Sequence, residues 1–173
     1  MNEIGLFIIP IKFDSSIKTY NDYLDLACEL ENYGYTNLYI GEHLTDKRED
    51  IQSSIVFASA ILARTKRIKV GLSVLALPHY NIKLLVKQLE DLQKLGNGRL
   101  MIGVGPGALE SDANYLGINH KNRPEIFSKN FSDLKNQLSI SQVFKNFDNR
   151  NIFSTILSPS PLKVSKLIQE GYS

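Results

Sequence analysis

The sequence contains a single cysteine, Cys28, among its 173 residues. One thiol cannot close an internal disulfide or build a multi-thiolate metal site, so both kinds of framework are excluded. No apolar run approaches the roughly 20 residues that a helix needs to cross a bilayer. The apolar stretch Ile4–Ile11 lies between Glu3 and Lys12 and is too short for a secretory signal. We therefore predict a cytoplasmic protein that does not enter a membrane.

Charge of one sign is also lacking. The 20 basic and 18 acidic residues give a net charge of +2, and the basic residues form no long run. Nucleic acid is therefore not an expected partner. Signatures of metal and hydrolase sites are missing too: the sequence has no HxH, HExxH or GxSxG pattern, and His79 and His120 have no ligand-like spacing. We predict no metal site.

What the sequence does contain is a repeating alternation of two kinds of segment. Short apolar runs rich in β-branched residues begin 33, 31, 32 and 52 residues apart. Continuously apolar strands are typical of parallel sheets that are buried on both faces. The runs are Ile4–Ile9, Asn37–Gly41, Ile68–Leu77, Leu100–Val104 and Ile152–Leu157.

The segments between these runs have helical periodicity, with apolar residues three and four positions apart. Gly34 and Gly96 lie where helices should end. Alternating strands and helices predict a parallel α/β fold, either an eight-unit barrel or an open doubly wound sheet. The stripes are Tyr20, Tyr23, Ala27 and Leu30; Ile51, Ile55, Ala58 and Leu62; Ile82, Leu85, Leu89 and Leu92; and Phe127, Phe131, Leu134 and Leu138.

Candidate chemistry lies at the carboxyl ends of the predicted strands, where parallel α/β folds place their sites. Glu42 and His43 follow the second strand, and a carboxylate beside an imidazole can orient it or tune its proton affinity. Taken alone, the dipeptide fits a surface turn better. The third strand contains the small residues Gly71, Ser73 and Ala76, which would let a flat ring approach the backbone. A plain core strand explains them equally simply.

Glycine-rich chain follows the fourth strand, with glycines spaced as GxGxG from Gly103 to Gly107. The spacing matches neither a P-loop nor the GxGxxG dinucleotide fingerprint, so a phosphate cradle and a tight turn remain equal alternatives. After the fifth strand, Ser158–Pro161 could bind an anion or simply cap the next helix.

The order of these pieces is more specific than any one of them. The sequence has GEH after strand two and LP after strand three, then NGRLxxGVGPGALxSDAxxLGI, an arginine, and SP before the last predicted helix. In this order they resemble the luciferase-like flavin-dependent monooxygenases, most of all their limonene monooxygenase-like branch. The stretch Arg99–Arg123 is the most specific. The similarity extends from the first strand to about Phe127 and resumes more weakly over Ile152–Tyr172.

This resemblance implies a (β/α)₈ barrel that uses reduced FMN, supplied by a separate flavin reductase, and O₂ to oxygenate a small organic substrate. It implies that His43, preceded by Glu42, is the catalytic histidine that helps to form or protonate a flavin peroxide. It also implies that Ser73 and Val74 form a non-proline cis peptide beneath the flavin ring.

The resemblance further implies a place for the ribityl-phosphate of FMN. Gly105, Pro106, Gly107 and Ala108 match the loop that runs beside it, and Ser160 matches a phosphate-binding serine. These residues are therefore the expected cofactor-binding set.

The predicted fold class is α/β, of the (β/α)₈ TIM-barrel type truncated to about five β/α units, with residues 1–173 as one domain. Five units cannot close an eight-stranded barrel, so we expect the first and fifth strands to be open edges. Three hypotheses follow. The chain is part of an enzyme that needs a completing chain or a second copy. It is a non-catalytic relative that binds flavin or a partner. It is an unrelated open α/β protein, which the stretch Arg99–Arg123 disfavours.

Overall fold

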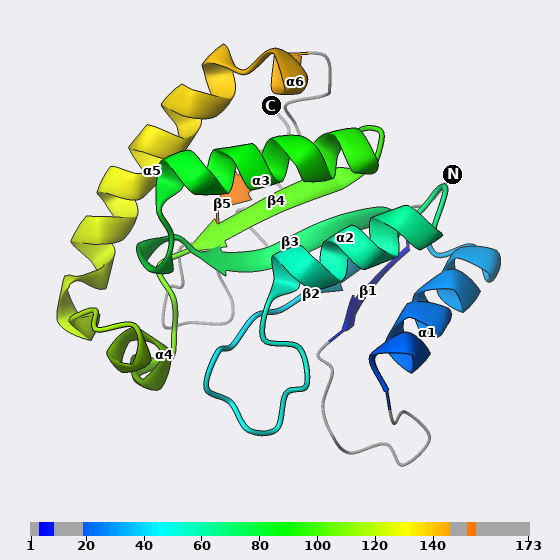
Figure 1. Ribbon diagram of the computed structural model, residues 1–173, viewed down its shortest axis with the longest axis horizontal. Helices are drawn as coiled ribbons and strands as arrows, with labels where there is room; N and C mark the ends of the chain where they lie inside the picture. Colours follow the sequence, from blue (N-terminus) through cyan, green and yellow to red (C-terminus); the bar gives the residue numbers. More distant parts are fainter. Residues whose placement is uncertain (1–3, 9–18, 146–151, 155–173) are drawn as a thin grey trace.

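The computed structural model of the chain describes residues 4–8, 19–145 and 152–154. Its centre is a five-stranded parallel sheet with the order β1-β2-β3-β4-β5 (Figure 1). Each predicted apolar run forms one of these strands. The strands are β1 (Gly5–Ile8), β2 (Asn37–Ile40), β3 (Lys69–Ala76), β4 (Leu100–Gly105) and β5 (Ile152–Ser154).

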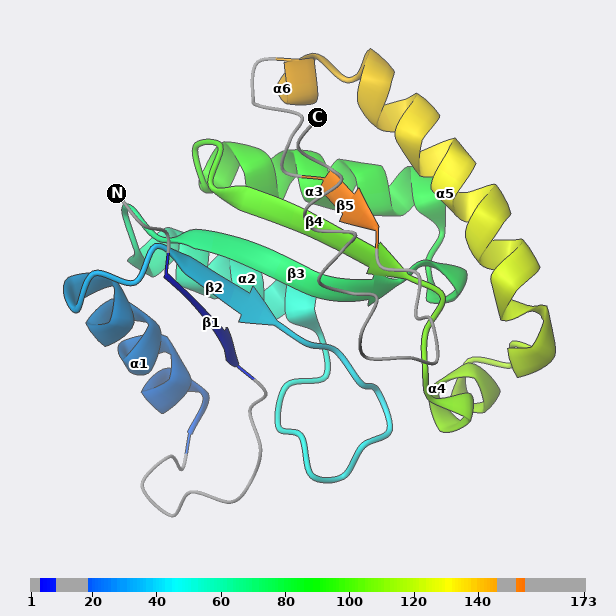
Figure 2. The same cartoon turned by 180° about the vertical axis from the view of Figure 1, so that it is seen from behind.

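Helices connect the strands and cover one face of the sheet. Figure 1 shows α2 and α3 in front of the strands, and Figure 2 shows them behind. Among the described residues, no helix has the length and hydropathy that a bilayer-spanning segment requires. The helices are α1 (Tyr20–Asn32), α2 (Ser54–Arg64), α3 (Ile82–Leu95), α4 (Glu110–Tyr115), α5 (Arg123–Ile140) and α6 (Gln142–Lys145), with 3₁₀ turns η1 (Leu77–His79) and η2 (His120–Asn122).

The strand order decides between the two architectures that the sequence allowed. A doubly wound sheet reverses its order near the middle and carries helices on both faces. Here each strand pairs with the next one in the chain, and α2 and α3 lie on the same face (Figures 1 and 2). This is the arrangement of consecutive β/α units in a barrel wall.

The hydrophobic core lies between the sheet and its helices. Leu38 and Ile40 of β2 are fully buried, as are Phe57 and Ile61 of α2 and Leu89 of α3. Successive strand residues point to opposite faces, so every second side chain of β2 enters this core. Burial of these apolar side chains fixes the register of the sheet, because a slip by one residue would turn them outward.

The opposite face of the sheet is built around an aromatic ring. Tyr39 of β2 lies over Gly5 of β1 and Gly71 of β3. A Cβ atom at Gly71 would lie 2.6 Å from Cδ1 of the Tyr39 ring, and one at Gly5 would lie 2.9 Å from its Cε2. Real side chains do not approach so closely, so both neighbours of the ring must be glycine for it to lie flat.

The predicted helical stripes were correct in α3 and partly correct elsewhere. Tyr20 is 41% exposed because it is the first residue of α1, where it meets the Phe57 ring edge-on at 5.3 Å. Ile51 is buried but precedes α2. The predicted helix ends at Gly34 and Gly96 are confirmed: Gly34 has a φ of +92° just after α1, and Gly96 is the C-cap of α3. The predicted helix over residues 162–173 lies outside the described residues.

Arg99 fastens the amino-terminal side of the sheet to the end of α2. Its guanidinium donates to the carbonyl oxygens of Leu62, Thr65 and Ile68 at 2.8–3.0 Å, and to the Thr65 hydroxyl at 3.0 Å. The last carbonyls of a helix have no partner within the helix, so a donor from another element satisfies them. This gives Arg99 a structural role in the stretch that carries the family resemblance.

We predict that Arg99→Leu lowers the free energy of unfolding by about 2–3 kcal/mol, because several part-buried carbonyls lose a charged donor. Denaturant unfolding followed by circular dichroism measures the change. The control is Lys94→Ala, which removes an exposed ion pair with Asp91 at 3.2 Å and should cost less than about 0.5 kcal/mol. Equal unfolding midpoints for Arg99→Leu and wild type would contradict this role.

Candidate active site

The carboxyl ends of β2, β3 and β4 lie along one edge of the sheet because the strands are parallel and in register. Ile40 pairs with Leu72, and Ala76 pairs with Gly105. The loops that follow these strands therefore start side by side. His43 follows Ile40 by three residues, which places most of the sequence-predicted site at this edge.

Glu42 joins three elements at this edge. One carboxylate oxygen accepts from the backbone N–H of Ser54 at 3.0 Å and from its hydroxyl at 2.8 Å, and the other accepts from the Tyr80 hydroxyl. Ser54 is the first residue of α2, where a negative charge is favourable. Burial and the neighbouring carboxylate raise the pKa of Tyr80 well above its ordinary value, so the phenol stays neutral. Glu42 thus holds the loop in place.

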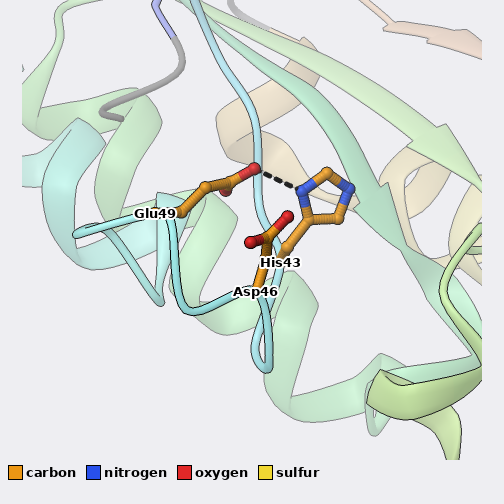
Figure 3. A group of neighbouring side chains, drawn as sticks. All are labelled: His43, Asp46 and Glu49. Carbon is orange, nitrogen blue, oxygen red and sulfur yellow. Dashed lines mark hydrogen bonds and ion pairs between the residues drawn. The ribbon is translucent and has the colours of Figure 1, made fainter. Parts of the chain in front are cut away.

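The carboxylate that contacts His43 is Glu49, not the adjacent Glu42. His43 Nδ1 lies 2.6 Å from Glu49 Oε1 (Figure 3). The Glu49 side chain is only 6% exposed, whereas the His43 side chain is 36% exposed. Nothing in the sequence indicated this partner, because a carboxylate six residues later in a loop has no periodic signature.

Asp46 lies beside this pair but is engaged by a cation of its own. Arg48 donates from Nε to Asp46 Oδ1 at 3.0 Å and from a terminal nitrogen to Oδ2 at 2.6 Å. These hydrogen bonds hold the pKa of Asp46 well below its ordinary value. His43, Asp46 and Glu49 each bring one atom within 4.8 Å of the others, which is close enough for a metal ion (Figure 3). Because Arg48 already neutralises Asp46, we assign no cation to the group.

A buried carboxylate anchors the tip of the same loop to α4. Asp112, 3% exposed, accepts at one oxygen from the Thr45 backbone N–H at 2.9 Å and from the Thr45 hydroxyl at 2.6 Å. The Thr45 hydroxyl is also 2.6 Å from the Ser111 hydroxyl. The loop that carries His43 is therefore fixed at both of its sides, by Glu42 and by Asp112.

The ladder between β3 and β4 is interrupted at Ser73 and Val74. Leu72 pairs with Ile102 and Leu75 with Val104, so the two residues between them lie opposite Gly103 alone. This two-against-one arrangement is a β-bulge, a feature that is common beside active sites. Both residues are partly exposed within a strand that is otherwise largely buried, and a cis peptide bond joins them, as the resemblance implied.

The glycine-rich loop after β4 packs against the turn after β3. Gly107 has a φ of +80°, and a Cβ atom there would lie 3.2 Å from Ala76 Cβ and 3.4 Å from His79 Nε2. Pro106 and Gly107 are half-buried and Ala108 is exposed. Burial lowers the pKa of His79 below its ordinary value. Ser160, the predicted phosphate-binding serine, lies outside the described residues.

A cavity of about 250 Å³ opens between the loops after β2 and β3. It combines carboxylate, phenol and imidazole groups with two leucines, a mixture that suits a small organic molecule with a polar group. Its lining is Glu42, Leu44, Gln52, Ser53, His79, Tyr80 and Leu116.

Comparison with known proteins identifies the origin of this arrangement. Residues 5–129 match the model of the luciferase-like monooxygenase family. The chain belongs to this family. It is 35% identical over 119 residues to limonene 1,2-monooxygenase of Rhodococcus erythropolis, and the match covers 67% of this chain and 30% of that protein. It is also 25% identical to F420-dependent glucose-6-phosphate dehydrogenase of Amycolatopsis mediterranei, over 75% of this chain and 39% of that protein.

A similar solved structure is the oxygenating constituent of 3,6-diketocamphane monooxygenase from Pseudomonas putida in complex with FMN. The TM-score is 0.71 at 21% identity, and the match covers 80% of this chain and 40% of that one. The predicted family and the predicted fold of TIM-barrel type are confirmed. The chain spans about a third of the curated relatives' length, and these relatives include both monooxygenases and F420-dependent oxidoreductases.

We predict that Asp112→Ala lowers the free energy of unfolding by about 2–3 kcal/mol and loosens the loop, because Thr45 loses its only charged acceptor among the described residues. Trypsin should then cleave faster after the exposed Lys47 and Arg48. Cleavage rates are measured by mass spectrometry under native conditions. Glu110→Ala, an exposed change on the same helix, should leave them unchanged. An unaltered rate in Asp112→Ala would show that the loop is held elsewhere.

Proposed function

We propose that this chain provides the amino-terminal part of a flavin-dependent monooxygenase site, which uses reduced FMN and O₂ to oxygenate a small organic substrate. The observation that supports this best is a convergence at one edge of the sheet. There the His43 imidazole, held by a buried carboxylate, shares the edge with the β3 bulge and the loop after β4. Family membership gives this arrangement its chemistry.

The described residues fit an FMN molecule in two respects. At the bulge, Ser73 and Val74 lie opposite Gly103, which has no side chain, so a flat ring can approach the sheet. The half-buried loop of Gly105, Pro106, Gly107 and Ala108 follows directly and would run beside the ribityl-phosphate, with Ser160 as a further ligand. Bound reduced FMN would supply the reaction with O₂, while the protein supplies position and exclusion of water.

His43 is the group that we propose to hold or transfer a proton. Its ring is 36% exposed, and Nε2 lies on the side of the ring away from Glu49 (Figure 3). General acid–base catalysis requires a ring nitrogen that can reach the reacting atoms. We propose that Glu42, which we predicted as catalytic, contributes by fixing the loop through Ser54 and Tyr80.

FMN is our choice over F420 because the monooxygenase relative is more similar than the F420-dependent one, at 35% against 25% identity. A flavin reductase in the cytoplasm would then supply the reduced cofactor. The chain covers 30% of the monooxygenase relative, so we propose that a completing chain or a second copy contributes the remainder of the pocket. A chain that binds flavin without consuming O₂ would instead be a non-catalytic binding module.

We predict that Pro106→Glu weakens binding of reduced FMN about tenfold or more, because a carboxylate beside the phosphate repels it. Anaerobic fluorescence titration measures the affinity. The matched control is Gln88→Glu, which adds the same charge at an exposed position of α3, on the other face of the sheet. This control should bind as the wild type does.

Riboflavin, which lacks the phosphate, provides the second comparison. Wild type and Pro106→Glu should bind reduced riboflavin equally, since there is no phosphate to repel. Equal FMN affinities for Pro106→Glu and wild type would refute the assignment of this loop to the phosphate. Binding of F420 but not FMN would replace the proposed cofactor.

A further inference from the structure

We propose that Glu49 is a positioning residue that fixes the tautomer and orientation of His43, so that Nε2 is the nitrogen presented to the site. The effect on the imidazole follows from the geometry of the pair. Only its catalytic value rests on the proposed function.

The contact between the two groups is short and has little competition. His43 Nδ1 and Glu49 Oε1 are 2.6 Å apart, which is typical of a charge-assisted hydrogen bond. Glu49 Oε2 is buried and has no hydrogen-bond partner among the described residues. His43 is therefore the one side chain there to which this carboxylate is bonded.

The arrangement is a poor way to gain stability. A buried carboxylate loses its hydration, and a single hydrogen bond replaces only part of it. Replacing a buried charged pair with apolar residues is often neutral or stabilising. A Glu at position 49 is therefore better explained by what it does to His43 than by its contribution to folding.

The chemical consequence concerns the two nitrogens of the ring. A carboxylate accepts hydrogen bonds and cannot donate one while it is ionised, so the Nδ1 atom of His43 must carry the proton of this bond. In the neutral ring, Nε2 is then left with its lone pair. When Nε2 takes a proton, both nitrogens carry one, and Glu49 balances the charge of the imidazolium. The same hydrogen bond limits rotation of the ring about its χ angles.

Other charges near the ring do not compete for Nδ1. Asp46 faces His43 from the same loop, but both of its oxygens accept hydrogen bonds from Arg48. Asp46 thus provides a matched control, a second carboxylate close to the imidazole that makes no hydrogen bond to it among the described contacts.

The test is nitrogen NMR of the full chain labelled with ¹⁵N-histidine, without flavin, at a pH where the rings are neutral. A His43→Gln variant assigns the His43 signals. We expect Nδ1 of wild-type His43 to be protonated and Nε2 to be unprotonated. In Glu49→Leu this preference should be lost and the two tautomers should mix, whereas Asp46→Asn should keep the wild-type pattern. Signals of His79 and His120 should be unchanged in both variants.

A wild-type ring with unprotonated Nδ1 would overturn the proposal, and this reading does not depend on the folding of any variant. A folded Glu49→Leu variant, with a wild-type melting temperature and an unchanged His43 pattern, would overturn it as well. Since no flavin is present, these outcomes are separate from those of the FMN titration. A chain that binds no reduced FMN refutes the proposed function, while the nitrogen signals still decide the role of Glu49.

Discussion

The parallel pairing of β2, β3 and β4 is the constraint on which the rest of the structure depends. Because Ile40 lies opposite Leu72 and Ala76 lies opposite Gly105, three loops leave the sheet at the same edge. The apolar core behind the sheet maintains that register. No site residue needs to be brought from a distance by a flexible segment, since the strands themselves deliver the loops to one place.

Carboxylates do the work in the loops that hydrogen-bonded ladders do in the strands. Glu42 ties the loop after β2 to α2 and to Tyr80, and Asp112 ties its tip to α4. On the other side of the sheet, Glu31 accepts from three consecutive backbone N–H groups before β3. Loop backbone has few partners of its own, so such acceptors give it a defined shape. A histidine placed on so well anchored a loop is preorganised.

Much of the fold could be predicted from the sequence because it depends on local patterns. Apolar runs located all five strands, and their spacing near 32 residues indicated β/α units. The family motif located His43 and the interruption at Ser73. The partners Glu49 and Asp112 could not be predicted, because the contact between Thr45 and Asp112 joins residues 67 positions apart. Hydrogen bonds between loops leave no periodic trace, and burial of a carboxylate is invisible before the chain is folded.

The ring of Tyr39 has a consequence for how this sequence can evolve. It spans three strands, and the positions beneath it, Gly5 and Gly71, have no room for a methyl group. A larger residue at either position is compatible only with a smaller one at position 39. The three sites therefore form one unit of covariation, although they lie more than thirty residues apart in the chain. Homologues should keep the glycine–tyrosine–glycine set together or replace it together, and chimaeras that exchange β2 alone should misfold.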